Sequence, residues 1–180
     1  MEKTPVTVWI HANQAARFDL LKKRQRQEER ATIAALKKEG MATRDARITV
    51  AEMRAVEWPS LSTIVAAAVD ARLSRPDLAG PWRPLSTRER QRLALSGRWP
   101  GPDIGRLRQR HYELPSPLVE RLRTTAWRTS EDALEELERR GLVGAGLALD
   151  KGQRETRNRL AACLYPVPRI VREALDDARF

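Results

Sequence analysis

Residues 108–130 read RQRHYELPSPLVERLRTTAWRTS, and this stretch decides how the rest of the chain is interpreted. Side chains alternate in character up to Pro115, which favours an extended conformation for the residue before it. The alternation predicts a strand over residues 110–114. Pro117 suits the first turn of a helix, and apolar residues then recur at helical spacing: Leu118, Leu122 and Ala126. The stretch therefore predicts a strand followed by an amphipathic helix.

A second helix is predicted directly after the first. Ser130 is expected to cap it, because its hydroxyl can accept from a free N–H of the first turn. Glu131 and Asp132 fall in that first turn, where their negative charges interact favourably with the helix dipole. Gly141 is predicted to end the helix. The simplest alternative for the whole segment is a loop followed by two helices that only pack a core.

Residues 110–140, RHYELPSPLVERLRTTAWRTSEDALEELERR, resemble the ribbon-helix-helix family of DNA-binding proteins. In that family, strands from two subunits pair and enter the major groove, and the second helix begins at a phosphate. The resemblance implies that Gln109, His111 and Glu113 face outward. It implies that Tyr112 and Leu114 face inward, and that Ser130 lies at a phosphate.

The N-terminal half contains a second candidate unit, because residues 5–73 resemble the same family more weakly. TPVTVWI, residues 4–10, alternates as a half-buried strand does. A long charged helix is predicted over residues 12–39, and another helix over 61–73. Residues 48–69, ITVAEMRAVEWPSLSTIVAAAV, also resemble a helix-turn-helix. If both units exist, the two strands could pair within one chain.

The chain is predicted to be mainly α, with short strands, helix pairs and a long N-terminal helix. SRPDLAGPWRPLS, residues 74–86, is the clearest linker. We expect an N-terminal unit over 1–75, a Pro-, Arg- and Trp-rich connection with a short helix over 76–105, and a C-terminal unit over 106–180. Residues 58–73 and 165–180 share an aromatic-Pro break, Ile-Val and a later Asp, and either chance or an internal repeat explains this.

Basic residues are concentrated rather than spread evenly. The net charge is +10, and residues 81–115 hold eight arginines against three acidic residues. Such clustering favours a polyanion-binding surface, whereas an Arg-rich composition alone would spread the charge. Trp82 and Trp99 lie among these arginines and suit either base stacking or a small core. The candidate DNA-binding residues are Thr7, Lys22, Lys23, Arg88, Arg92, Arg98, Arg106, Arg108, Gln109, Arg110, His111 and Ser130.

Several other function classes are disfavoured by the sequence. Cys163 is the only cysteine, so no disulfide forms within the chain, and His11 and His111 lie far from it. We therefore expect no metal site, no cofactor and no enzymatic activity. The longest apolar runs are too short to span a bilayer, and the first residues lack the apolar core of a signal peptide. We expect a cytoplasmic protein without a membrane partner.

These observations favour a double-stranded DNA-binding protein. We expect a bacterial transcriptional regulator, or an accessory factor for partition or transfer of a plasmid or another mobile replicon. The alternative is a helical adaptor that binds another protein through residues 12–39 and its tryptophans. A two-stranded ribbon is marginal alone, so we expect a homodimer or a larger homo-oligomer, unless the strands pair internally.

Overall fold

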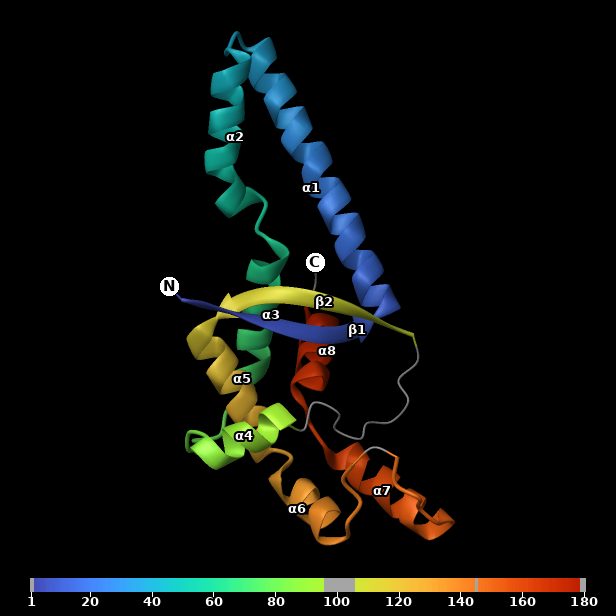
Figure 1. Ribbon diagram of the computed structural model, residues 1–180. Helices are drawn as coiled ribbons and strands as arrows, with labels where there is room; N and C mark the ends of the chain where they lie inside the picture. Colours follow the sequence, from blue (N-terminus) through green and yellow to red (C-terminus); the bar gives the residue numbers. More distant parts are fainter. Residues whose placement is uncertain (1, 96–105, 145, 179–180) are drawn as a thin grey trace.

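The computed structural model describes residues 2–95, 106–144 and 146–178. Within these ranges the chain is mainly helical with a two-stranded antiparallel sheet, which confirms the predicted class. Figure 1 shows the elements in their order along the chain. They are β1 (Lys3–His11), α1 (Ala12–Lys38), α2 (Thr43–Glu57), α3 (Leu61–Leu73), α4 (Thr87–Leu95), β2 (Leu107–Pro115), α5 (Ser116–Arg128), α6 (Glu131–Arg139), α7 (Lys151–Cys163) and α8 (Val167–Asp177).

The two strands form one ribbon within the chain. They pair antiparallel along their full lengths, with Thr7 opposite His111 at the centre. Lys3 lies opposite Pro115 at one end, and His11 lies opposite Leu107 at the other. Both predicted strands are confirmed and are longer than expected. The same chain supplies both strands, whereas in the expected homodimer the pairing strand would come from a second subunit.

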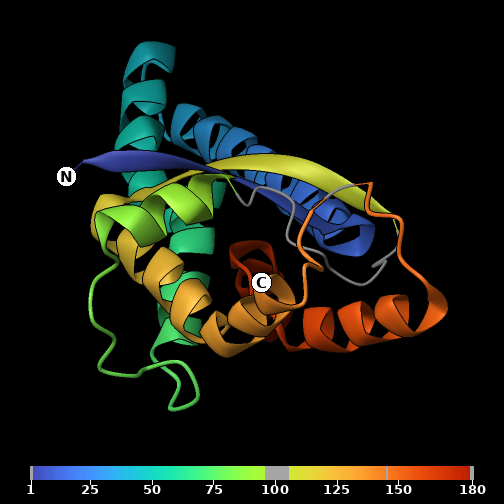
Figure 2. The ribbon, with the colours of Figure 1, turned by 60° about the horizontal axis from the view of Figure 1, so that its bottom comes forward.

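The inner face of the ribbon is apolar and covers the main hydrophobic core. Alternate residues turn inward, as a period of two requires: Val6, Val8, Ile10, Tyr112 and Leu114. Helices α3 and α8 cross beneath this face, and α5 packs beside them, as Figure 2 shows. All three helices therefore cover one face of the ribbon and leave the other face open.

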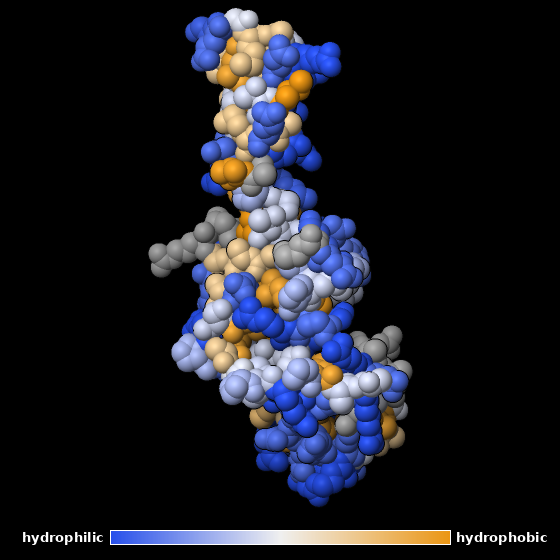
Figure 3. Space-filling view, turned by 90° about the vertical axis from the view of Figure 1, so that its left-hand side faces the viewer, coloured by the Kyte–Doolittle hydropathy of each residue, from blue (hydrophilic) through white to orange (hydrophobic). Residues whose placement is uncertain are grey.

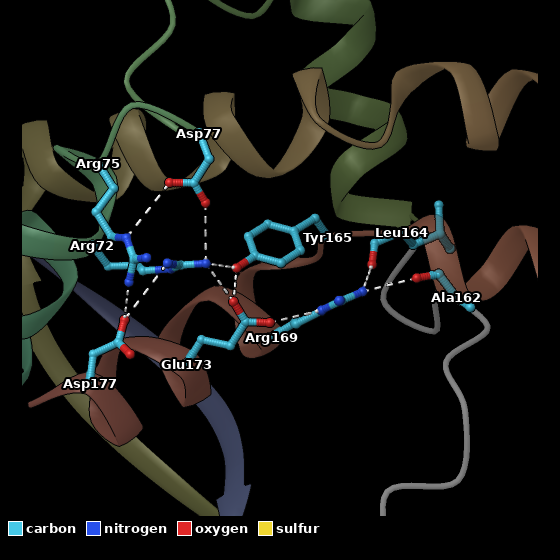
Figure 4. A network of polar contacts seen from close by, with 9 residues as sticks. All are labelled: Arg72, Arg75, Asp77, Ala162, Leu164, Tyr165, Arg169, Glu173 and Asp177. Carbon is cyan, nitrogen blue, oxygen red and sulfur yellow. Dashed lines mark hydrogen bonds and ion pairs between the residues drawn. The ribbon is translucent and has the colours of Figure 1, made fainter.

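Helices α3 and α8 are the two segments whose sequences resemble each other. Val65 and Val69 of α3 and Ile170 and Leu175 of α8 are fully buried, and the two helices pack against each other. At one end of this pair, charged groups join the helices across the contact (Figure 4). Arg72 donates to Tyr165 and to Glu173, whose Oε2 lies 2.7 Å away. The contact between α3 and α8 is thus both apolar and ionic.

Helices α1 and α2 form an antiparallel arm that extends beyond the body (Figures 1 and 3). Helix α1 has 27 residues, so it is about 40 Å long. Trp58 closes the base of the arm, since its indole N–H donates to Glu28 at 3.0 Å. Arg54 adds a bidentate pair with Glu29 at 3.0 and 2.9 Å. The predicted long charged helix is confirmed, and α2 is its intramolecular partner.

A second apolar cluster lies away from the ribbon, where α6 and α7 pack against each other and against the end of α5. It buries Leu134 and Leu137 together with Trp127, Leu142 and Leu164. The homodimer was expected because a two-stranded ribbon is marginal alone, so that its apolar face and those of the following helices need a partner. These faces are buried within one chain, so the physical reason for expecting a homodimer no longer applies. Among the described helices, none is both long and apolar enough to cross a membrane.

The prediction that the Ser130 hydroxyl caps the following helix is wrong. Ser130 precedes α6, but its side chain makes no capping hydrogen bond. Its hydroxyl accepts instead from the backbone N–H of Tyr165 at 2.8 Å, and the residue is only 1% exposed. Because the turn before α8 packs onto this position, the hydroxyl is not available to a phosphate.

Candidate nucleic-acid interface

The open side of the ribbon carries the exposed side chains of both strands, and we call it the outer ribbon face. Alternate residues of each strand point to it, and all of them are exposed. Its members are Pro5, Thr7 and Trp9 of β1, and Gln109, His111 and Glu113 of β2. The expectation that Gln109, His111 and Glu113 face outward, with Tyr112 and Leu114 inward, agrees with this burial pattern.

Cross-strand pairs arrange these side chains in three rows. At the centre, Thr7 Oγ1 and His111 Nδ1 are hydrogen-bonded at 2.8 Å. Trp9 lies opposite Gln109 and is 48% exposed, which is unusual for so large an apolar side chain. Trp9 was not among the sequence-predicted site residues, although the alternation of β1 already turned it to the same face as Thr7.

The helices beneath the ribbon hold its two outer edges. The backbone N–H of Glu113 donates to Ser62 Oγ of α3 at 3.0 Å. On the other edge, the Arg172 guanidinium of α8 donates to the carbonyl of Trp9 at 2.9 Å. Edge strands normally present unpaired backbone groups. Because α3 and α8 satisfy some of these groups, the outer ribbon face rests on a fixed support.

The arginines before residue 95 do not form the acid-free patch that their spacing suggested. Arg83 lies 3.4 Å from Glu89, and Arg90 lies 3.1 Å from Glu120 of α5. One acid within the stretch, Glu89, and one that is distant in sequence, Glu120, therefore partly neutralise this region. Arg88 is exposed on α4 and has no ion pair with a described residue. The side chain of Arg92, and all of Arg98, fall outside the described residues.

The arginines of β2 lie on a different face from Gln109, His111 and Glu113. Arg108 and Arg110 share their alternation with Tyr112, so they point away from the outer ribbon face. Arg110 lies 3.3 Å from Asp19 at the base of α1. Arg106 precedes the strand and is exposed. The predicted arginine cluster is thus divided between α4, the start of β2 and the base of the arm.

A groove joins the arm to the ribbon. It has a volume of about 850 Å³ and lies between α1, α2, the start of α3 and the free edge of β2. Lys22 and Arg26 of α1 line it together with His111 of the outer ribbon face. Lys23 is exposed beside them. The structure therefore brings the predicted residues Lys22 and His111 to one continuous surface, and adds Arg26 to it.

Two ionisable groups of the described residues have pKa values that local contacts or burial shift strongly. Burial raises the pKa of Tyr112 to about 12. Hydrogen bonds from Arg128 and Ser86 lower the pKa of Glu89 to about 2 and anchor α4. The described ranges hold no group of three or more His, Cys, Asp or Glu residues that could bind a metal ion.

Comparisons of the chain with protein-family models, with curated proteins and with solved structures found no match.

Proposed function

We propose that the protein binds double-stranded DNA and inserts its outer ribbon face into the major groove. The observation that carries this proposal is the pairing of β1 with β2, which gives a ribbon with one apolar face and one exposed face. Within the described ranges, helices cover only the apolar face. A two-stranded ribbon with a free side fits the major groove, which is about 12 Å wide.

The side chains on the outer ribbon face suit direct reading of base edges. Gln109 can pair in a bidentate manner with adenine, and Glu113 can accept from the amino group of cytosine. His111 and Thr7 offer further donors and acceptors at the centre. Trp9 presents an apolar surface that suits the methyl group of thymine. The face therefore combines polar and apolar readers in adjacent rows.

The order of elements supports a ribbon-helix-helix relationship in both halves of the chain. Each strand is followed at once by a helix, α1 after β1 and α5 after β2. We assign α3 and α8 as the second helices of the two units, since they pack together beneath the ribbon. On this assignment α2 is an insertion in the first unit, and α6 with α7 is an insertion in the second. The protein would then act as a single-chain counterpart of a dimer.

The charge of the chain supports a polyanionic partner. A net charge of +10 draws a protein to nucleic acid, and phosphate contacts supply much of the affinity for DNA. The corresponding biological role is that of a cytoplasmic bacterial regulator of transcription. An accessory factor in partition or transfer of a mobile replicon has the same molecular requirements, because both must recognise a short duplex site.

Selection from a pool of random duplexes tests this proposal. Immobilised protein is mixed with the pool, and the bound duplexes are amplified and sequenced over several rounds. We expect a short recurrent motif, because base-edge contacts favour particular sequences. Retention of DNA without any recurrent motif would contradict recognition through the outer ribbon face.

A protein-binding adaptor is the second candidate function. One observation favours it: α2 exposes apolar side chains, namely Ile48, Met53 and Val56, the last of which is 80% exposed. Apolar residues are visible along the arm in Figure 3. Exposed apolar groups of this kind mark protein contacts. A folded protein that retained no duplex at low salt would favour the adaptor over the DNA-binding protein.

A further inference from the structure

We infer that the arm is a second DNA-contacting element, and that it binds the phosphates of the duplex on one flank of the ribbon site only. This inference rests on the proposed function. The contacting residues are Lys22, Lys23, Arg26 and Arg30 of α1, which we call the basic stripe.

The basic stripe occupies one side of α1. Lys22, Arg26 and Arg30 are spaced four residues apart, so they lie above one another on the helix, and Lys23 lies beside them. All four side chains are exposed. They line a shallow hollow of about 470 Å³ that also contains Asp19 and Gln27. The stripe therefore remains open to solvent.

The acidic residues next to the stripe already have their own cationic partners. Asp19, at its base, is paired with Arg110 of β2. Glu29, on the side toward α2, is held by Arg54 at 2.9 Å. The four cations of the stripe have no ion pair with any residue in the described ranges. Their charge is therefore available for an external anion.

The stripe is continuous with the outer ribbon face. Lys22 and Arg26 line both the hollow along α1 and the groove that contains His111. A DNA strand whose bases contact the ribbon must pass its backbone along the free edge of β2, where this groove lies. From Lys22 to Arg30 the helix advances about 12 Å, which equals the rise of about three to four base pairs. The stripe thus matches a short run of phosphates.

The other half of the described chain has no matching arm. Helix α5 takes the position after β2 that α1 takes after β1, but it has only 13 residues. Leu118, Val119 and Leu122 of α5 are buried in the core. The additional phosphate contacts therefore fall on one flank, and the footprint on DNA should be asymmetric.

The test compares two doubly substituted proteins of equal charge on a duplex that extends well beyond the ribbon site on both sides. The first is Arg26→Gln with Arg30→Gln. The control is Lys151→Gln with Arg159→Gln on α7, whose side chains are exposed and unpaired within the described ranges. Helix α7 lies at the opposite end of the molecule from the arm (Figure 1). Circular dichroism verifies that both variants are folded.

We expect the arm variant to lose roughly tenfold in affinity at low salt. The slope of log affinity against log salt should become shallower by about 1.8, since each lost phosphate contact removes about 0.9. Hydroxyl-radical footprinting should show lost protection on one flank only, while the control keeps the affinity, slope and footprint of the unmodified protein.

Two results would overturn the inference, and they are distinguishable. If the unmodified protein binds the duplex and the arm variant keeps the same slope and footprint, the arm inference fails while the proposed function stands. If the folded, unmodified protein binds no duplex at low salt, the proposed function fails, and the arm inference fails with it.

Discussion

Thr7 Oγ1 and His111 Nδ1 lie 2.8 Å apart at the centre of the ribbon, although 104 residues separate them in the sequence. They occupy the same place in two strands that run in opposite directions. In a homodimer these positions would hold identical residues. Here one chain supplies both strands, so the two halves of the outer ribbon face carry different side chains.

The first prediction is that the recognised DNA site is not palindromic. Palindromic sites reflect the two-fold symmetry of dimeric proteins. The β1 half presents Pro5, Thr7 and Trp9, whereas the β2 half presents Gln109, His111 and Glu113. The motif recovered from random duplexes should therefore read differently on its two strands. A recovered motif with clear two-fold symmetry would refute the single-ribbon account.

The second prediction concerns base reading. Gln109→Ala and His111→Ala should each reduce discrimination between the best and altered sites by about 1–3 kcal/mol, because base-edge hydrogen bonds are lost. Lys22→Gln should instead weaken binding to all duplexes alike, since a phosphate contact carries no sequence information. Affinities for a panel of single-base variants measure both effects. Equal behaviour of the three substitutions would show that the strand does not read bases.

The third prediction is that the protein is a monomer. The apolar faces of the ribbon, α3, α5 and α8 are buried within one chain, so no second copy is needed to cover them. Light scattering at micromolar concentration should give a mass near the 20.5 kDa of one chain. A stable dimer at that concentration would contradict this prediction and revive the homodimer that the sequence suggested.

The fourth prediction concerns the joint between α3 and α8. Arg72, whose side chain is 10% exposed, lies near Glu173, Asp77 and Asp177 at 2.7, 3.5 and 3.7 Å. Arg72→Met should lower the free energy of unfolding by about 2 kcal/mol, because it leaves part-buried acceptors without their donor. Urea denaturation measures the change.

A neighbouring arginine provides the matched control for the joint. Arg75 also contacts Asp77 and Asp177, but half of its side chain is exposed. Arg75→Met should therefore cost less than about 1 kcal/mol, as expected for exposed ion pairs. Equal losses for the two substitutions would mean that Arg72 does not act through its burial between α3 and α8.

Local sequence patterns predicted much of the ribbon. The period-two alternation of residues 4–10 and 110–114 predicted both strands, and the ribbon-helix-helix resemblance implied the outward direction of Gln109 and His111. Pairing of the two strands was one of two possibilities, because alternation fixes which face a residue takes but not which strand lies beside it. Contacts between segments separated by 104 residues leave no local signal.

The wrong predictions for Ser130 and for the arginines before residue 95 have the same origin. Ser130 has the sequence signature of a helix cap, yet the turn before α8 uses its hydroxyl for the N–H of Tyr165. Arg90 belongs to a stretch with few acids in sequence, but folding places it beside Glu120 of α5. In both cases a residue from a distant element takes the interaction that the local pattern assigned elsewhere. Trp9 was not predicted as a site residue because tryptophan is usually buried, whereas Trp9 is exposed.

Binding of a mixed-sequence duplex to the unmodified protein over a series of salt concentrations tests the central claim most directly. Fluorescence anisotropy of labelled DNA reports the affinity at each step. We predict tight binding at low salt and a linear fall of log affinity with log salt, because phosphate contacts release counterions. Folded protein that leaves the anisotropy of the duplex unchanged at the lowest salt would contradict the claim that the outer ribbon face binds DNA.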